Sequence, residues 1–305
     1  MALSGSFQDH HLEMFRDKLD MELQQRGSLL LGTVRREKVD GVKNYFDKLG
    51  KATSYEKTGR NQLKNYQTPS FERRQLSFET RSSDILSDRI DVLDMAGNPN
   101  ADYVEAMRLE LGRDIDEIII EAIKGNATVI TNGSSSSTAL PAGSKVAVNN
   151  HDYDSGTGDV ALTVGKLKKA IALLGEDHVD VSRETVYCIA PMAQLMNLAT
   201  EAEVTSRDYR SSEALETKGA IPGLNGYLGL TFIAYEETGT DANSDELAFV
   251  YPESAIKVGM RQDLTVRVNE DFTRTAHPTS LSAWIDLGAV RMYEEKVIQI
   301  ACDPL

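Results

Sequence analysis

One long helical segment constrains the fold more than any other stretch of this sequence. Residues 103–124 contain no proline, and Gly125 follows them. Apolar residues recur there at spacings of three and four, the period of one helix face: Val104, Met107, Leu111, Ile115, Ile118 and Ala122. Asp102 or Asn100 can cap the start, and Gly125 can end the helix. The segment therefore predicts a helix of about 33 Å, long enough to serve as a spine.

A glycine inside this helix predicts a close neighbour. Gly112 costs the helix about 1 kcal/mol relative to alanine. Such a cost is understandable where another part of the chain approaches the helix backbone, so we expect close packing at Gly112.

The segments after the spine alternate between helical and strand patterns. In chain order they predict helices over 160–175 and 191–199, and strands over 184–189 and 227–234. Alternating residues over 256–268 and 290–300 predict an antiparallel sheet, which the spine can pack across. Four consecutive serines at 134–137 indicate a flexible surface loop or a junction between modules. Together these elements predict an α+β protein.

Charge is distributed unevenly along the chain. Its net value of −14 argues against general nucleic-acid binding. Residues 1–34, 35–81 and 82–305 carry net charges of −2, +6 and −18. A basic segment attached to an acidic body can attract other copies of the same chain.

The basic segment has a second unusual property, which is its shortage of apolar residues. Over 53–70 almost nothing is hydrophobic, and residues 74–81 then alternate as in a half-exposed strand. We expect a long two-stranded excursion with a mobile tip. An isolated ribbon is marginal in water, so it needs another surface to lie on. An ordinary solvated hairpin or a linker is the alternative.

The N-terminal segment also predicts an element that docks on something else. Residues 6–26 have one apolar helix face, formed by Leu12, Phe15, Leu19 and Leu23. This helix would cover the core of a monomer or reach a neighbour in an oligomer. No apolar run approaches the ~18 residues of a membrane span.

Motifs of chemistry are largely missing from the sequence. It has no Walker loop, Rossmann glycine fingerprint, nucleophile elbow or paired-histidine zinc motif. Residues 152–159 lack the ligand pattern of an EF-hand loop and fit a solvated turn better. Cys188 lies in an apolar run and is expected to be a buried free thiol. We therefore expect no catalytic, cofactor or metal site, although an enzyme without a linear signature stays an alternative.

Three short strings resemble the major capsid proteins of tailed bacteriophages, which have the Hong Kong 97 fold. Residues 23–28 (LQQRGS) look like the end of that family's N-arm helix, especially in short-tailed phages. Residues 111–119 with Gly125-Asn126-Ala127 are similar to its spine helix. Residues 288–291 (GAVR), followed by Val297 and Ile298, are similar to its C-terminal strands. The resemblance covers nearly the whole chain, in the family's order.

The resemblance implies a division of the chain into named parts. In order these are an N-terminal arm (1–35), an extended E-loop (36–81), a P-domain with the spine helix (82–126), an A-domain (127–250), and P-domain strands with the C-terminus (251–305). It also implies that copies form pentamers and hexamers that close into an icosahedral head around double-stranded DNA, without sequence-specific binding. The protein would then be structural and not an enzyme.

The family also implies partners and a location. A separate scaffolding protein and a portal protein are expected, and a cement or decoration protein stays open. The chain would assemble in the host bacterial cytoplasm and reside in the virion, with no membrane contact. The other classes considered are an encapsulin-type bacterial compartment shell and a soluble hydrolase or transferase.

Five basic residues of the excursion are the expected inter-subunit contacts. They are Lys57, Arg60, Lys64, Arg73 and Arg74. Reversing the charge of Arg73 and Arg74 is expected to leave the subunit folded and to weaken closure of the shell.

Overall fold

The computed structural model describes residues 27–41, 44–64, 66–87, 100–131, 133–151, 156, 158–180, 183–201, 227–275 and 277–304. The helix expected over 6–26 lies outside these residues. The chain divides into two compact units. The first comprises Met1–Ser28, Glu79–Asp116 and Met260–Leu287, and the second comprises Leu29–Phe78, Glu117–Gly259 and Gly288–Leu305.

The predicted spine is confirmed as helix α2 (Asn100–Lys124). Its apolar face is buried, with Met107 1% and Leu111 0% exposed. The close neighbour expected at Gly112 is also confirmed, because a Cβ there would lie 2.8 Å from the backbone of Gly27. Ser28 Oγ donates to the Asp116 carboxylate one turn further along the helix. The chain at 27–28 is therefore fastened to the helix by both packing and a hydrogen bond.

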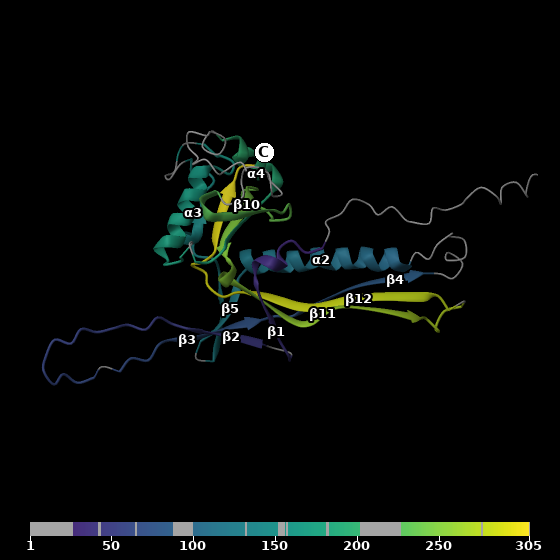
Figure 1. Ribbon diagram of the computed structural model, residues 1–305, viewed down its shortest axis with the longest axis horizontal. Helices are drawn as coiled ribbons and strands as arrows, with labels where there is room; N and C mark the ends of the chain where they lie inside the picture. Colours follow the sequence, from purple (N-terminus) through teal and green to yellow (C-terminus); the bar gives the residue numbers. More distant parts are fainter. Residues whose placement is uncertain are drawn as a thin grey trace, which may run out of the picture. The chain divides into compact units, whose positions relative to one another are not determined.

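The strands of the first unit form a ribbon beside this helix. Strand β4 (Glu79–Ser87) pairs antiparallel with β12 (Thr279–Arg291), and β11 (Ile256–Glu270) lies on the other side of β12. The N-terminal part of α2 runs along β4 and β12 (Figure 1). One face of β12 is buried over residues 281–287, and Asp286 on the other face is buried as well. The buried apolar side chains of that face are Leu281, Ala283, Ile285 and Leu287.

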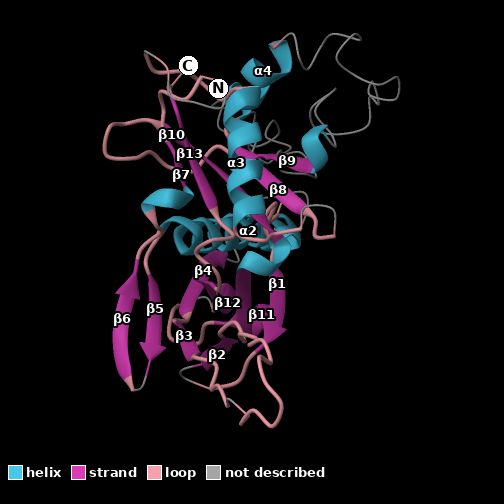
Figure 2. Ribbon diagram, turned by 90° about the vertical axis from the view of Figure 1, so that its left-hand side faces the viewer, coloured by secondary structure: helices cyan, strands magenta, loops and turns pink. Residues whose placement is uncertain are grey.

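The second unit contains a five-stranded sheet with helices packed on it. Its strand order is β7-β13-β10-β8-β9. The strands are β7 (Lys145–Val146), β8 (Val186–Ala190), β9 (Leu230–Ala234), β10 (Glu246–Pro252) and β13 (Ile298–Cys302). The helices are α3 (Val164–Glu176), which crosses the sheet in Figure 2, and α4 (Met192–Thr200). The helices and strands predicted over 160–199 are thus confirmed, apart from small shifts of their ends.

Polar groups inside this sheet's core find partners in the same chain. Lys166 is fully buried, and its Nζ donates to the carbonyl oxygens of Val160 (2.6 Å) and Ala301 (2.8 Å). Burial lowers the pKa of this lysine. The Gln194 amide donates to Glu246 and to the Asp303 carbonyl, both at 2.8 Å. The C-terminal strand is therefore held by two buried side chains.

Both cysteines lie in this core as buried free thiols, as expected for Cys188. Burial raises the pKa of both, that of Cys302 to about 12. No helix among the described residues is both long and apolar enough to cross a membrane.

A second sheet in this unit carries the basic segment. Its order is β2-β3-β5-β6, and every neighbouring pair is antiparallel. The strands are β2 (Asn44–Leu49), β3 (Phe71–Leu76), β5 (Ala127–Thr131) and β6 (Ser134–Thr138). Strand β1 (Arg35–Lys38) belongs instead to the sheet of β11 and β12. The expected two-stranded excursion therefore exists, as β2 and β3.

Two expectations about this region are wrong. The serines at 134–137 form strand β6, because backbone hydrogen bonds to β5 hold them although their side chains are exposed. Residues 74–81 are not one strand, since the chain leaves β3 after Leu76 and enters β4 at Glu79, which belongs to another sheet.

Candidate functional site: the base of an exposed loop

The loop between β2 and β3 is the most exposed part of the described chain. No described residue over 51–64 is even partly buried. It carries apolar side chains all the same, and Leu63 and Tyr66 are 89% and 86% exposed. Large apolar side chains exposed on one loop make it the candidate contact surface of the described chain.

Of the predicted basic residues, those of the loop lie on its surface. Lys57, Arg60 and Lys64 are all exposed. Arg73 in strand β3 is also largely exposed, and its Nε lies 2.8 Å from a carboxylate oxygen of Asp47 on β2. These four side chains are therefore accessible on the surface of the single chain.

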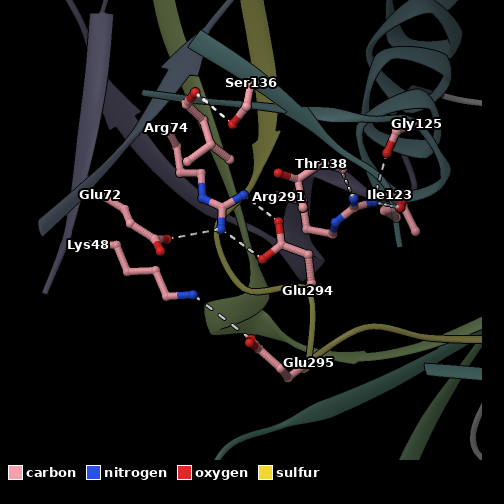
Figure 3. A network of polar contacts seen from close by, with 11 residues as sticks. Lys48, Glu72, Arg74, Ile123, Gly125, Ser136, Thr138, Arg291, Glu294 and Glu295 are labelled. Carbon is pink, nitrogen blue, oxygen red and sulfur yellow. Dashed lines mark hydrogen bonds and ion pairs between the residues drawn. The ribbon is translucent and has the colours of Figure 1, made fainter. Parts of the chain in front are cut away.

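Arg74 behaves differently from its neighbour Arg73. Successive side chains of a strand face opposite sides, and that of Arg74 faces inward and is 2% exposed. Its two terminal nitrogens donate to the two carboxylate oxygens of Glu294, one of them at 2.7 Å (Figure 3). Glu294 is also buried. The expectation that Arg74 can be reversed without harm to the subunit is therefore wrong, because reversal would place two buried carboxylates together.

A second buried arginine lies beside this pair. The Nη1 of Arg291 donates to the carbonyl oxygens of Ile123 (2.6 Å) and Gly125 (2.8 Å), and its Nη2 donates to that of Thr138 (3.2 Å). The first carbonyl belongs to the last turn of helix α2 and the second to the residue after its end, where the helix dipole favours a cation. Burial lowers the pKa of Arg291, Glu294 raises it and Arg74 lowers it further. Glu294 thus binds Arg74 directly and acts on Arg291 through its charge.

The turn between β12 and β13 also contacts strand β2. Lys48 Nζ lies 4.9 Å from the ring centre of Tyr293 and 3.9 Å from a carboxylate oxygen of Glu295. Lys296 Nζ lies on the same ring at 5.1 Å and donates to Ser254. Residues 293–296 therefore bind both strands from which the loop emerges (Figure 3).

The sequence did not reveal Glu294 and Arg291 as residues of the loop base. The charged turn at 294–296 was visible, and Arg291 belongs to one of the strings that carried the family resemblance. Nothing in the local pattern showed that either side chain is buried. The described residues contain no group of three or more His, Cys, Asp or Glu that could hold a metal ion.

Comparison with known proteins identifies the family. A family described as "Phage capsid protein" matches residues 8–304. The chain belongs to the phage capsid protein family. A search of curated proteins found no match.

Solved structures of phage capsids share the fold. The capsid of Ralstonia phage GP4 is 11% identical with a TM-score of 0.72, and the match covers 100% of this chain and 99% of that one. The cyanophage Pam1 capsid is 13% identical, with a TM-score of 0.70 and coverage of 99% and 98%. The capsid of cyanophage P-SCSP1u is 14% identical, with a TM-score of 0.69 and coverage of 99% and 96%.

These matches confirm the predicted resemblance and the α+β, Hong Kong 97-like capsid fold. The protein is a phage major capsid protein, and its family and fold are those of a structural protein. The family match also favours a phage capsid over a bacterial compartment shell.

Proposed function

We propose that copies of this protein assemble into pentamers and hexamers, which close into an icosahedral head around double-stranded DNA. The observation that carries the proposal is the exposed loop between β2 and β3, which presents apolar side chains without a core of its own. The family membership and the whole-length fold match support the same conclusion.

The loop contacts an adjacent copy through charge as well as apolar area. Residues 51–70 carry four basic side chains and one acidic side chain, whereas residues 82–305 carry a net charge of −18. Opposite charges at a contact favour the correct pairing and speed association. Lys57, Arg60, Lys64 and Arg73 make these contacts. Arg74 supports the loop from inside its own subunit.

The remaining parts of the proposal follow the family. The chain divides into an N-terminal arm (1–35), an E-loop (36–81), a P-domain (82–126 and 251–305) and an A-domain (127–250). A scaffolding protein and a portal protein take part in assembly, and a cement protein can join the finished head. Assembly takes place in the host cytoplasm, the DNA is enclosed without sequence-specific contacts, and the protein has no enzymatic activity.

Sedimentation velocity and negative-stain electron microscopy of the full-length protein test this proposal. We expect capsomers or megadalton particles, with the phage's scaffolding protein added if the chain alone does not close. The variant Lys57→Glu/Lys64→Glu should shift the protein toward smaller species. Lys145→Glu, an exposed lysine on β7, is the control and should assemble normally. A protein that stays monomeric at all concentrations with scaffold present would contradict the proposal.

A further inference from the structure

We propose that Glu294 is a positioning residue for assembly, which fixes the base of the exposed loop so that the loop is presented correctly to the next copy. The inference rests on the proposed function of the loop. Glu294 itself is buried and is not expected to touch a neighbouring subunit.

The position of Arg74 in the sheet explains why one contact can fix the loop. Arg74 lies opposite Phe46 on β2 and opposite Val129 on β5, so it sits where three strands meet. Phe46 is also buried. Only two residues separate Arg74 from Phe71, where β3 begins and the exposed loop ends. Holding Arg74 therefore holds both strands close to the point where they leave the protein body.

Glu294 connects Arg74 to a rigid part of the same unit. It follows β12 by three residues, and Arg291 at the end of β12 is bound to the last carbonyls of α2. Bidentate pairing of a guanidinium with a carboxylate fixes direction as well as distance. The contact thus transmits the orientation of β12 and α2 to the loop base.

The charges make Glu294 more important than its partner. Arg74 binds this buried carboxylate directly, and the buried Arg291, whose terminal nitrogens bind backbone carbonyls, is stabilised by its charge. Removing the charge of Glu294 leaves Arg74 with the partly exposed Glu72, 3.6 Å away, and takes a stabilising charge from Arg291. Removing Arg74 leaves the charge of Glu294 partly compensated by that of Arg291. The Glu294→Gln variant is therefore expected to loosen the loop base more than Arg74→Gln.

The neighbouring Glu295 is a matched control for this test. It lies in the same turn and faces Lys48 on β2, but at 3.9 Å and with a side chain that is 54% exposed. An exposed pair at this distance contributes little. Glu295→Gln removes the same charge from the same turn without touching the buried pair.

Hydrogen exchange of unassembled subunits, combined with particle yield from electron microscopy, tests the inference. In Glu294→Gln we expect amides of β2 and β3 to exchange at least tenfold faster, while β8, β10 and β13 keep their protection. Shell yield should fall at least tenfold, with a smaller fall for Arg74→Gln and none for Glu295→Gln. If Glu294→Gln is insoluble, Arg74→Lys provides the same readout, because lysine keeps the charge but not the bidentate geometry.

Two results would overturn the inference. One is unchanged exchange at β2 and β3 in Glu294→Gln together with normal shells. The other is an equal loss of protection over every strand, which would make Glu294 a general stability residue. A wild-type protein that forms no shells would instead contradict the proposed function, whatever the exchange experiment shows.

Discussion

The five-stranded sheet and the loop between β2 and β3 belong to the same unit, but the sheet buries its side chains and the loop exposes them. Strand β10 buries every residue after Glu246, and the buried Lys166 and Gln194 of helices α3 and α4 bind groups of their own chain. The loop buries none of its described residues over 51–64. One region is complete within a single chain, and the other is the one that we propose a neighbouring copy covers.

The base of the loop lies between these two extremes. Arg74 and Glu294 are as buried as core residues, yet they stand next to the exposed Arg73. A loop that has no core of its own can therefore still have both of its ends fixed by buried contacts. Substitutions in the core, the base and the loop should therefore have effects of different size and kind.

The largest effect is expected in the core. Met107 is 1% exposed on the buried face of α2, so Met107→Asp places an unpaired charge among apolar side chains. We expect no soluble folded protein, measured by expression yield and circular dichroism. Leu63→Asp, the same kind of change in the loop, should fold normally. Soluble, cooperatively folding Met107→Asp protein would show that the spine does not belong to the core.

The next largest effect is expected at the loop base. Glu294→Gln should lower the free energy of local opening at β2 and β3 by about 3–5 kcal/mol, because it breaks a buried ion pair and leaves a charged partner behind, while the five-stranded sheet keeps its stability. Native-state hydrogen exchange of the unassembled subunit measures this loss. Glu295→Gln should change the value by less than about 1 kcal/mol. Equal losses in the two variants would remove the distinction between buried and exposed pairs.

Substitution of the apolar loop residues should impair assembly without affecting the folding of the subunit. Leu63→Ser/Tyr66→Ser changes two highly exposed side chains, so subunit stability should stay within about 0.5 kcal/mol of wild type. Shell yield should nevertheless fall strongly, since these side chains are proposed to be covered by the next copy. Normal assembly of this variant, measured by sedimentation velocity, would mean that charge alone carries the contact.

A smaller effect is expected for the exposed arginine of β3. Arg73→Glu should leave the subunit folded and weaken assembly most at low salt, because salt screens exposed charges in wild type as well. Light scattering during assembly at two salt concentrations measures the difference. Arg183→Glu is a matched control, since Arg183 is also exposed and paired to a carboxylate, that of Asp180. Equal behaviour of the two variants would exclude a specific role for Arg73.

The smallest effect concerns the buried thiols. With a pKa raised to about 12, Cys302 stays protonated at pH 8 and still at pH 10, where an ordinary thiol has ionised. Cys188 is shifted in the same direction. A thiol reagent should therefore label neither residue in the native protein at either pH, but both after unfolding. Fast native labelling would indicate that the core sheet opens readily.

The structural elements that were predicted from the sequence are those that depend on local periodicity. The spacing of apolar residues in α2, the alternation over 256–268 that became β11, and Gly112 as a site of close approach all have a direct physical meaning along the chain. The single antiparallel sheet expected from 256–268 and 290–300 is wrong, because β11 and β13 belong to different sheets. The family resemblance extended these elements to the fold. Strand β6 escaped prediction because its serines are exposed, and only pairing with β5 makes them a strand.

The site was predicted only in part, for a similar reason. Exposed basic residues such as Lys57 and Lys64 can be recognised from composition. The inward side chain of Arg74 could not, because its partner Glu294 lies 220 residues away in the chain. Alternation along β3 predicts that Arg73 and Arg74 face opposite sides, but it does not say which side is buried. Burial of a charged side chain can be recognised only when the position of its partner in the fold is known.

Hydrogen exchange of residues 51–64, compared between free subunits and assembled particles, tests the central claim most directly. We predict fast exchange of these amides in the free subunit and strong protection in the particle, with β10 equally protected in both. Equally fast exchange of the loop in particles would show that no neighbouring copy covers it, and would contradict the account.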